Sequence, residues 1–69
     1  MFDKNLFKAQ LVLAGITVKQ LAEFLGINES TMYRKINADG DFSRSEINKM
    51  IDILNIEHPE DIFFSKKLA

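Results

Sequence analysis

Apolar residues return every three or four positions along almost the whole chain, and nowhere do they alternate with polar residues over a run long enough for a strand. This spacing places one apolar stripe on each helix, whereas a half-buried strand needs an apolar residue at every second position. The chain has 69 residues and no cysteine, so no disulfide can stabilise a small core. We therefore predict an all-α fold in which the helices pack into one compact domain.

Five helices are expected, because glycine, proline and capping residues divide the apolar pattern into five segments. They are about 3–14, 18–25 and 29–37, a fourth that follows the capping box of Ser43 and Glu46, and a short fifth that starts at His58-Pro59 and ends in Ile62, Phe63 and Phe64. The expected core is Phe7, Leu11 and Ala14, then Val18, Leu21, Ala22 and Leu25, then Met32 and Ile36, then Ile47, Ile51 and Leu54 with Met50 at the edge. The domain spans residues 1–69, with 65–69 expected as a flexible tail.

Short local signals predict the connection between the second and third helices. Thr17 and Gln20 have the spacing of a capping box, in which each side chain binds a backbone N–H of the other residue. Gly26 is suited to the left-handed conformation that ends a helix, and Asn28 can cap the next one. A turn of three or four residues is therefore expected between two helices.

The third expected helix has two unlike faces. Met32 and Ile36 lie close together on an apolar row, and the opposite side carries Ser30, Tyr33, Arg34 and Asn37. A two-turn helix with such a ridge can enter the major groove of DNA, where arginine can donate two parallel hydrogen bonds to guanine. An alternative is that this is the ordinary polar outer face of a small helical bundle, with Tyr33 covering the rim of the core.

The distribution of charge favours the first half of the chain as the part that meets a polyanion. The net charge is −1. Residues 1–38 hold five basic and three acidic groups, which gives +2, and residues 39–69 hold four basic and seven acidic groups, which gives −3. If nucleic acid is a partner, it is expected to meet the first half.

The run TVKQLAEFLGINESTMYRKIN, followed by DFSRSEINKMIDILNIEHPEDIFF, resembles the Cro/CI-type (XRE-like) helix-turn-helix repressors of phages and Gram-positive prophages. The resemblance covers about Phe7 to Phe64, and its marks are Ala22, Gly26, the apolar Ile27 and Met32. It implies a five-helix, lambda-repressor-like domain with a helix-turn-helix formed by the second and third helices. It further implies a transcription regulator that binds double-stranded DNA, usually as a homodimer on a near-palindromic operator.

The resemblance also implies roles for individual residues, with residues 29–37 as the recognition helix. Positions that contact bases in the family are occupied here by Glu29, Ser30 and Arg34. Positions that contact phosphates are occupied by Thr17, Lys19, Asn28, Thr31, Tyr33, Asn37 and Arg44. Three residues depart from the family pattern: Val18 replaces a glutamine that supports the first base-reading residue, Lys35 stands where an apolar residue is common, and Glu29 is an anion near a polyanion. Glu29 is expected either to accept a hydrogen bond from cytosine N4 or to discourage wrong sites.

Dimer contacts are expected at the apolar C-terminal end, at Phe63 and Phe64, because two adjacent residues of a helix cannot both point into one small core. The exposed apolar candidates Leu6, Val12 and Leu13 are a second possible surface. The alternative is that both rings straddle the seam between the first and fifth helices of one chain.

Nothing in the sequence indicates an enzyme, a cofactor, a metal site or a small-molecule substrate. There is no glycine-rich phosphate loop, and the acidic residues around His58 lack the order of a calcium loop. The chain has neither a membrane-spanning run nor a signal peptide, so we expect a soluble, cytoplasmic protein. The main alternative function is a protein-interaction module, such as an antirepressor or adaptor, that keeps the fold and binds another regulator through its apolar surplus.

Overall fold

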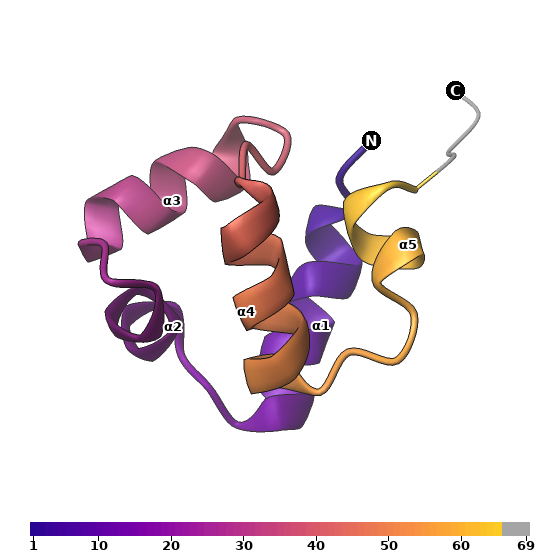
Figure 1. The fold of residues 1–69 in the computed structure, drawn as a ribbon, viewed down its shortest axis with the longest axis horizontal. Coiled ribbons are helices and arrows are strands. Elements are labelled where there is room, and N and C mark those ends of the chain that lie inside the picture. Colours follow the sequence, from indigo (N-terminus) through magenta and orange to yellow (C-terminus); the bar gives the residue numbers. More distant parts are fainter. Residues whose placement is uncertain (66–69) are drawn as a thin grey trace.

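The computed structural model describes residues 1–65, which form a bundle of five helices (Figure 1). The helices are α1 (Lys4–Ala14), α2 (Val18–Leu25), α3 (Glu29–Asn37), α4 (Arg44–Leu54) and α5 (Pro59–Phe63). No strand occurs among these residues, so the predicted all-α fold and the order of the helices are confirmed. In Figure 1, α2 and α3 lie at one end of the bundle, α5 and the N-terminus lie at the other, and α4 runs between them.

The first helix, expected over about residues 3–14, begins directly after Asp3 and ends directly before Gly15. The Asp3 carboxylate accepts a hydrogen bond from the Leu6 N–H at 3.0 Å, and Gly15 has a φ of +67°, which suits glycine. Phe7 is fully buried. Ala14, which was expected in the core, is exposed, because the last turn of α1 faces an open groove rather than a neighbouring helix.

The turn between α2 and α3 follows the predicted local signals. Thr17 Oγ accepts from the Gln20 N–H at 3.1 Å, and Gln20 Oε1 accepts from the Thr17 N–H at 2.9 Å. Gly26 ends α2 with a φ of +73°, and Asn28 Oδ1 then accepts from the Thr31 N–H at 2.7 Å to begin α3. A side chain thus binds one of the unpaired N–H groups in the first turn of each helix, which fixes where α2 and α3 begin.

The buried face of α4 differs from the prediction. Met50 and Leu54 are fully buried, whereas Ile47 and Ile51 are only half-buried. Met50 was expected at the edge, and it lies instead at the centre of the core. The reason is that Ile47 and Ile51 point into a groove between α4 and α5, so the helix is rotated about its axis relative to the predicted orientation.

Four phenylalanine rings from four segments of the chain pack together, and we call them the aromatic cluster: Phe2, Phe7, Phe42 and Phe63. The centroid of the Phe2 ring lies 5.2 to 5.9 Å from those of the other three. Phe63 is only 6% exposed, whereas the adjacent Phe64 is 63% exposed. The ring of Phe63 therefore packs inside its own chain, as the alternative had it for this residue, and has little surface left for a second chain. The dimer contact expected at Phe63 and Phe64 stays a prediction, with Phe64 as its exposed residue.

The segments at the two ends of the described chain are joined by backbone hydrogen bonds. The Asp3 N–H donates to Ile62 O, and the Ser65 N–H donates to Met1 O, both at 2.7 Å. Ser65, which was expected to begin a flexible tail, is thus held against the N-terminal segment. The rest of that predicted tail, residues 66–69, lies outside the described residues.

The N-terminal segment also supports the loop between α3 and α4. The Phe2 N–H donates to Asp39 Oδ1 at 3.3 Å, and a Cβ atom on Gly40 would overlap the Phe2 ring. Gly40 also has a φ of +69°. Glycine is therefore needed at this position both for the backbone conformation and for the close approach of Phe2.

Candidate nucleic-acid interface

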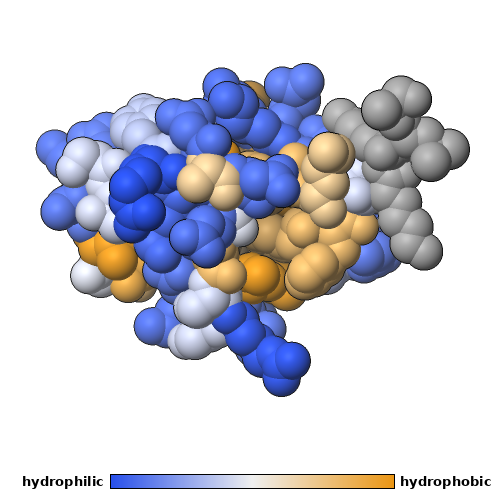
Figure 2. Space-filling view, turned by 90° about the horizontal axis from the view of Figure 1, so that it is seen from above, coloured by the Kyte–Doolittle hydropathy of each residue, from blue (hydrophilic) through white to orange (hydrophobic). Residues whose placement is uncertain are grey.

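The third helix presents opposite faces to the core and to the solvent, as predicted. Met32 and Ile36 are 0% and 4% exposed and anchor the helix in the core. The opposite side, which we call the polar face of α3, is exposed at every position: Glu29, Ser30, Tyr33, Arg34 and Asn37. Figure 2, seen from above Figure 1, shows hydrophilic side chains gathered at the α3 end of the molecule and an apolar area toward the α5 end. The polar face therefore presents hydrogen-bonding side chains to solvent along the whole length of α3.

The orientation of the polar face is fixed by the packing of α2. Leu21, Ala22 and Leu25 are buried and form the inner face of α2. Ala22 is only 1% exposed, and α2 packs more extensively against α3 than against any other helix. A small residue at a close helix crossing allows the two backbones to approach, which explains why the resemblance included an alanine here.

Hydrogen bonds at the start of α3 connect three of the predicted contact residues. Asn28 Oδ1 accepts from the Ser30 hydroxyl at 2.8 Å as well as from the Thr31 N–H at 2.7 Å. Since the Ser30 proton is directed toward Asn28, the Ser30 oxygen presents its lone pairs outward. Ser30 is therefore prepared to accept a hydrogen bond from a base amino group.

At the other end of the polar face, the structure adds a cation that the sequence reasoning missed. Lys4 Nζ, at the start of α1, donates to Asn37 Oδ1 at 3.1 Å. The Asn37 amide therefore turns its oxygen to Lys4 and keeps both N–H groups available as donors. No local pattern joins the two residues, which are 33 positions apart.

Lys35, in contrast, is turned away from the polar face and binds α4. Its Nζ lies 3.3 Å from Glu46 Oε1, and both side chains are less than a fifth exposed. Glu46 also closes the predicted capping box, because Oε1 accepts from the Ser43 N–H at 2.9 Å. Burial acts to raise the pKa of Glu46, but the Ser43 N–H and the Lys35 ammonium together outweigh it and hold the pKa below its ordinary value. Lys35 therefore neutralises a carboxylate inside the protein instead of offering a free charge to a ligand.

The remaining predicted phosphate-contacting residues lie on three different elements. Thr17 and Lys19 are exposed at the start of α2, and Arg44 is exposed at the start of α4. Thr31 is half-buried. Arg44 also lines the groove between α4 and α5 beside Phe64, which places a positive charge next to the exposed phenylalanine.

Comparison with known families matches residues 8–64 to the Cro/C1-type HTH DNA-binding domain. The chain belongs to this family. The match begins within α1 and extends through the whole of α5, so it includes the complete helix-turn-helix of α2 and α3. Neither a curated protein nor a solved structure gives a significant match to the chain.

Membership of the Cro/C1-type family establishes the chain as a DNA-binding domain and its ligand as double-stranded DNA. The family is one of DNA-binding regulators and is generally non-enzymatic. The resemblance read from the sequence is therefore confirmed at the level of family and fold. None of the described helices is both long and apolar enough to cross a membrane.

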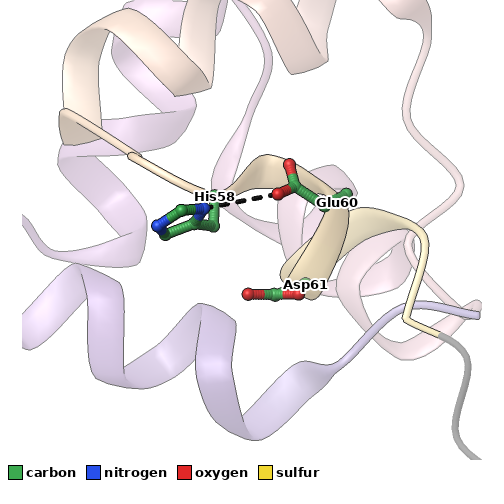
Figure 3. A group of neighbouring side chains, drawn as sticks. All are labelled: His58, Glu60 and Asp61. Atoms are coloured by element: carbon green, nitrogen blue, oxygen red, sulfur yellow. Dashed lines mark hydrogen bonds and ion pairs between the residues drawn. The ribbon is translucent and has the colours of Figure 1, made fainter.

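One group of acidic and histidine side chains in this Cro/C1-type domain has a spacing compatible with a metal ion. Among residues 1–65, ligand atoms of His58, Glu60 and Asp61 lie within 4.8 Å of one another (Figure 3). All three side chains are exposed, and His58 Nδ1 lies 3.4 Å from Glu60 Oε1. His58 occupies the N-cap position of α5 without a side-chain capping bond, and the two acids lie in the first turn. Acidic residues stabilise the positive end of a helix, and this accounts for their presence without an ion.

Proposed function

We propose that the chain is a sequence-specific transcription regulator, of the Cro or repressor kind found in phages and prophages, that inserts α3 into the major groove of its operator. The observation that supports this most directly is the polar face of α3, which is exposed along its whole length while Met32 and Ile36 hold the helix in the core. A short helix held this way presents side chains at the depth of the base edges. In this proposal the protein acts on DNA in the cytoplasm, as expected from the sequence.

In this proposal, three residues read bases. Arg34 donates two hydrogen bonds to guanine O6 and N7, which is the commonest specific contact. Ser30 accepts from a base amino group, in keeping with the orientation of its hydroxyl toward Asn28. Glu29 accepts from cytosine N4 or repels wrong sites, because an unpaired anion near phosphates is costly.

Other residues contact phosphates and set the register of the domain on the duplex. They are Thr17, Lys19, Asn28, Thr31, Tyr33, Asn37 and Arg44, as expected from the sequence, and we include Lys4 because it donates a hydrogen bond to Asn37. Few of them are charged, so nonspecific affinity should be modest and only moderately dependent on salt.

We further propose a homodimer on a near-palindromic operator, with Phe64 at the contact. Phe64 is exposed beside a groove of about 580 Å³ between α4 and α5, lined also by Phe42, Ile47 and Ile51. One short recognition helix reads only a few base pairs, and two copies about 34 Å apart would double the sequence read. An exposed aromatic beside an apolar groove is suited to such a contact.

DNA recognition is tested by selecting bound sequences from random duplex DNA and measuring gel shifts on the selected site. Arg34→Ala should weaken specific binding by roughly 1–3 kcal/mol and relax preference at one base pair. Lys8→Ala, which removes a positive charge from the exposed side of α1, is the matched control and should leave the preference unchanged. If Arg34→Ala weakened binding equally on every sequence, Arg34 would be a phosphate contact, and failure to select any sequence would refute specific recognition.

The dimer is tested by comparing two phenylalanines of similar exposure. Phe64 is 63% exposed on the α5 side, and Phe24 is 58% exposed on α2. Phe64→Ser should give a folded monomer by light scattering with less cooperative operator binding, whereas Phe24→Ser should keep the mass of the parent. Equal masses for the parent and both variants, with and without operator, would refute a dimer formed through Phe64.

A further inference from the structure

A second groove lies on the side of the domain away from α3. It has a volume of about 650 Å³ and is bounded by α1, the C-terminal end of α4 and the connection to α5. In Figure 1 this region is diagonally opposite α3. DNA bound at the polar face of α3 would therefore leave this groove open.

The lining of the groove is largely apolar and includes apolar side chains that are exposed to solvent. Leu6 and Leu13 of α1 are 44% and 82% exposed, and both line it together with Ile53 of α4. Leu6 near the start of α1 and Leu13 in its last turn thus present apolar side chains to solvent. Clustered exposed apolar side chains with a polar rim are typical of an interaction surface.

The rim of the groove is acidic. Glu57 and Asp61 line it, and neither lysine nor arginine is found among the described residues that do so. Glu60 is adjacent in the first turn of α5, and Figure 3 shows the Asp61 carboxylate on the side of α5 that faces α1. His58 is the other titratable residue of the lining. The groove therefore combines an apolar floor with a negative rim, which repels DNA and attracts cations.

We propose that this groove is a docking site for an amphipathic helix of another protein, with leucine-like residues on one face and lysine or arginine beside them. A helix of this kind buries its apolar face in a groove at helical spacing, and its cations complement Glu57 and Asp61. The site goes beyond DNA recognition and does not depend on it. Because the groove and α3 are on different sides, such a partner forms a ternary complex with the DNA-bound protein instead of displacing the DNA.

A second copy of the chain is a poorer occupant of the same groove. A twofold contact uses the same surface of both copies, so the interface would hold Glu57 and Asp61 twice, without a lysine or arginine from the described lining of either copy. Like charges brought together in an interface oppose association. The charge of the rim therefore selects a basic partner over self-association.

The proposal can be tested with a synthetic helical peptide that carries leucines on one face and lysines beside them along its edges, labelled for fluorescence anisotropy. Two neighbouring positions give a matched pair, because Leu13 and Val12 are both 82% exposed but only Leu13 lines the groove. Leu13→Ser should weaken peptide binding roughly tenfold or more, and Val12→Ser should leave it unchanged. Both variants should melt at the temperature of the parent and bind operator as the parent does, which separates this result from any failure of the proposed DNA function.

Charge provides the second arm of the experiment. Glu57→Gln combined with Asp61→Asn should weaken binding of the lysine peptide several-fold, whereas Asp52→Asn, which removes an exposed acid outside the groove, should not. A peptide with glutamates in place of the lysines should bind more weakly than the lysine peptide. Equal binding of both peptides, equal effects of Leu13→Ser and Val12→Ser, absence of binding to the parent, or loss of operator binding when the peptide is added would each overturn the proposal.

Discussion

Rings from four separate segments of the chain meet in the aromatic cluster, whereas the consecutive helices α2 and α3 are joined by a short capped turn. The aromatic cluster depends on contacts between residues far apart in the chain. The α2–α3 unit depends on hydrogen bonds between residues three positions apart, such as Thr17 with Gln20. One core joins the two regions, because Met32 and Ile36 of α3 are buried in the same cluster as Phe7 and Phe63. Substitutions of buried rings should therefore affect stability, whereas substitutions of exposed side chains on the polar face of α3 should affect DNA binding with little effect on stability.

The largest effect should come from truncating a buried ring of the aromatic cluster. Phe63→Ala should lower the free energy of unfolding by about 3–5 kcal/mol, because it leaves a cavity among Phe2, Phe7 and Phe42. The neighbouring Phe64→Ala, at an exposed position, should cost less than about 1 kcal/mol. Urea unfolding, at a protein concentration low enough to keep the chain monomeric, measures both changes in the free energy of unfolding. Similar values for the two variants would contradict the stabilising role of the aromatic cluster.

Two glycines allow a direct comparison, one in the turn between α2 and α3 and one in the α3–α4 loop, which Phe2 of the aromatic cluster contacts. Gly26→Ala should cost about 1–2 kcal/mol from the positive φ alone, since a Cβ there meets no atom within 4 Å. Gly40→Ala has the same backbone cost, and overlap with the Phe2 ring should add about 1–3 kcal/mol. Unfolding curves of the two variants give the difference. The double variant with Phe2→Leu should recover part of the cost at Gly40, and no recovery would show that Phe2 does not support the loop.

At the α3 end, a change on the surface should alter DNA binding and not folding. Glu29→Gln removes an exposed anion from the polar face and should strengthen nonspecific binding at low salt by up to about 1 kcal/mol, the scale of one charge interaction in water. The difference in affinity between the selected site and other DNA sequences should narrow, while the melting temperature of the protein stays unchanged. Gel shifts on selected and scrambled duplexes measure this. Unchanged nonspecific affinity at low salt would show that the charge has no filtering role.

The smallest effect concerns the ion pair that joins α3 to α4. Glu46→Gln keeps a capping acceptor for Ser43 but removes the charge that binds Lys35, and should cost about 0.5–1 kcal/mol at neutral pH. Because the pKa of Glu46 is lowered in the folded state, its charge contributes fully above the unfolded pKa of about 4.3 and is lost as the pH falls through the lower folded value. The free energies of unfolding of the parent and the variant, measured between neutral and acid pH, should therefore converge at the acid end. If the difference in the free energy of unfolding between the parent and Glu46→Gln did not change with pH, the cost would come from packing and not from charge.

The α2–α3 turn and the aromatic cluster also differ in how far the sequence predicts them. The turn between α2 and α3 was predicted with its caps because every signal acts within three residues of its partner, as Asn28 does on Thr31. The exposure of the polar face followed from the anchors Met32 and Ile36. In contrast, the burial of Phe2 depends on Gly40, and no periodicity connects residues so far apart.

The remaining differences have the same origin. For α4, Ile47 with Ile51 and Met50 with Leu54 are both spaced as one turn of a helix, and the packing of α4 against α1 and α2 decides which pair is buried. The hydrogen bond from Lys4 to Asn37 depends equally on how α1 lies beside α3. For Phe63 and Phe64, the sequence showed that only one ring could point squarely inward, and the packing of α5 determined which one.

The hydrogen bond from the Ser65 N–H to Met1 O nearly closes the described chain into a ring. A circular permutant that joins these segments through a short linker should therefore keep the fold, provided the chain is reopened at an exposed turn. The chain can be reopened beside Gly15, because a Cβ there would meet no atom within 4 Å. The new ends would then lie far in sequence from the α3–α4 loop. Such a permutant would display a fused reporter beside the last turn of α1 instead of beside the recognition helix.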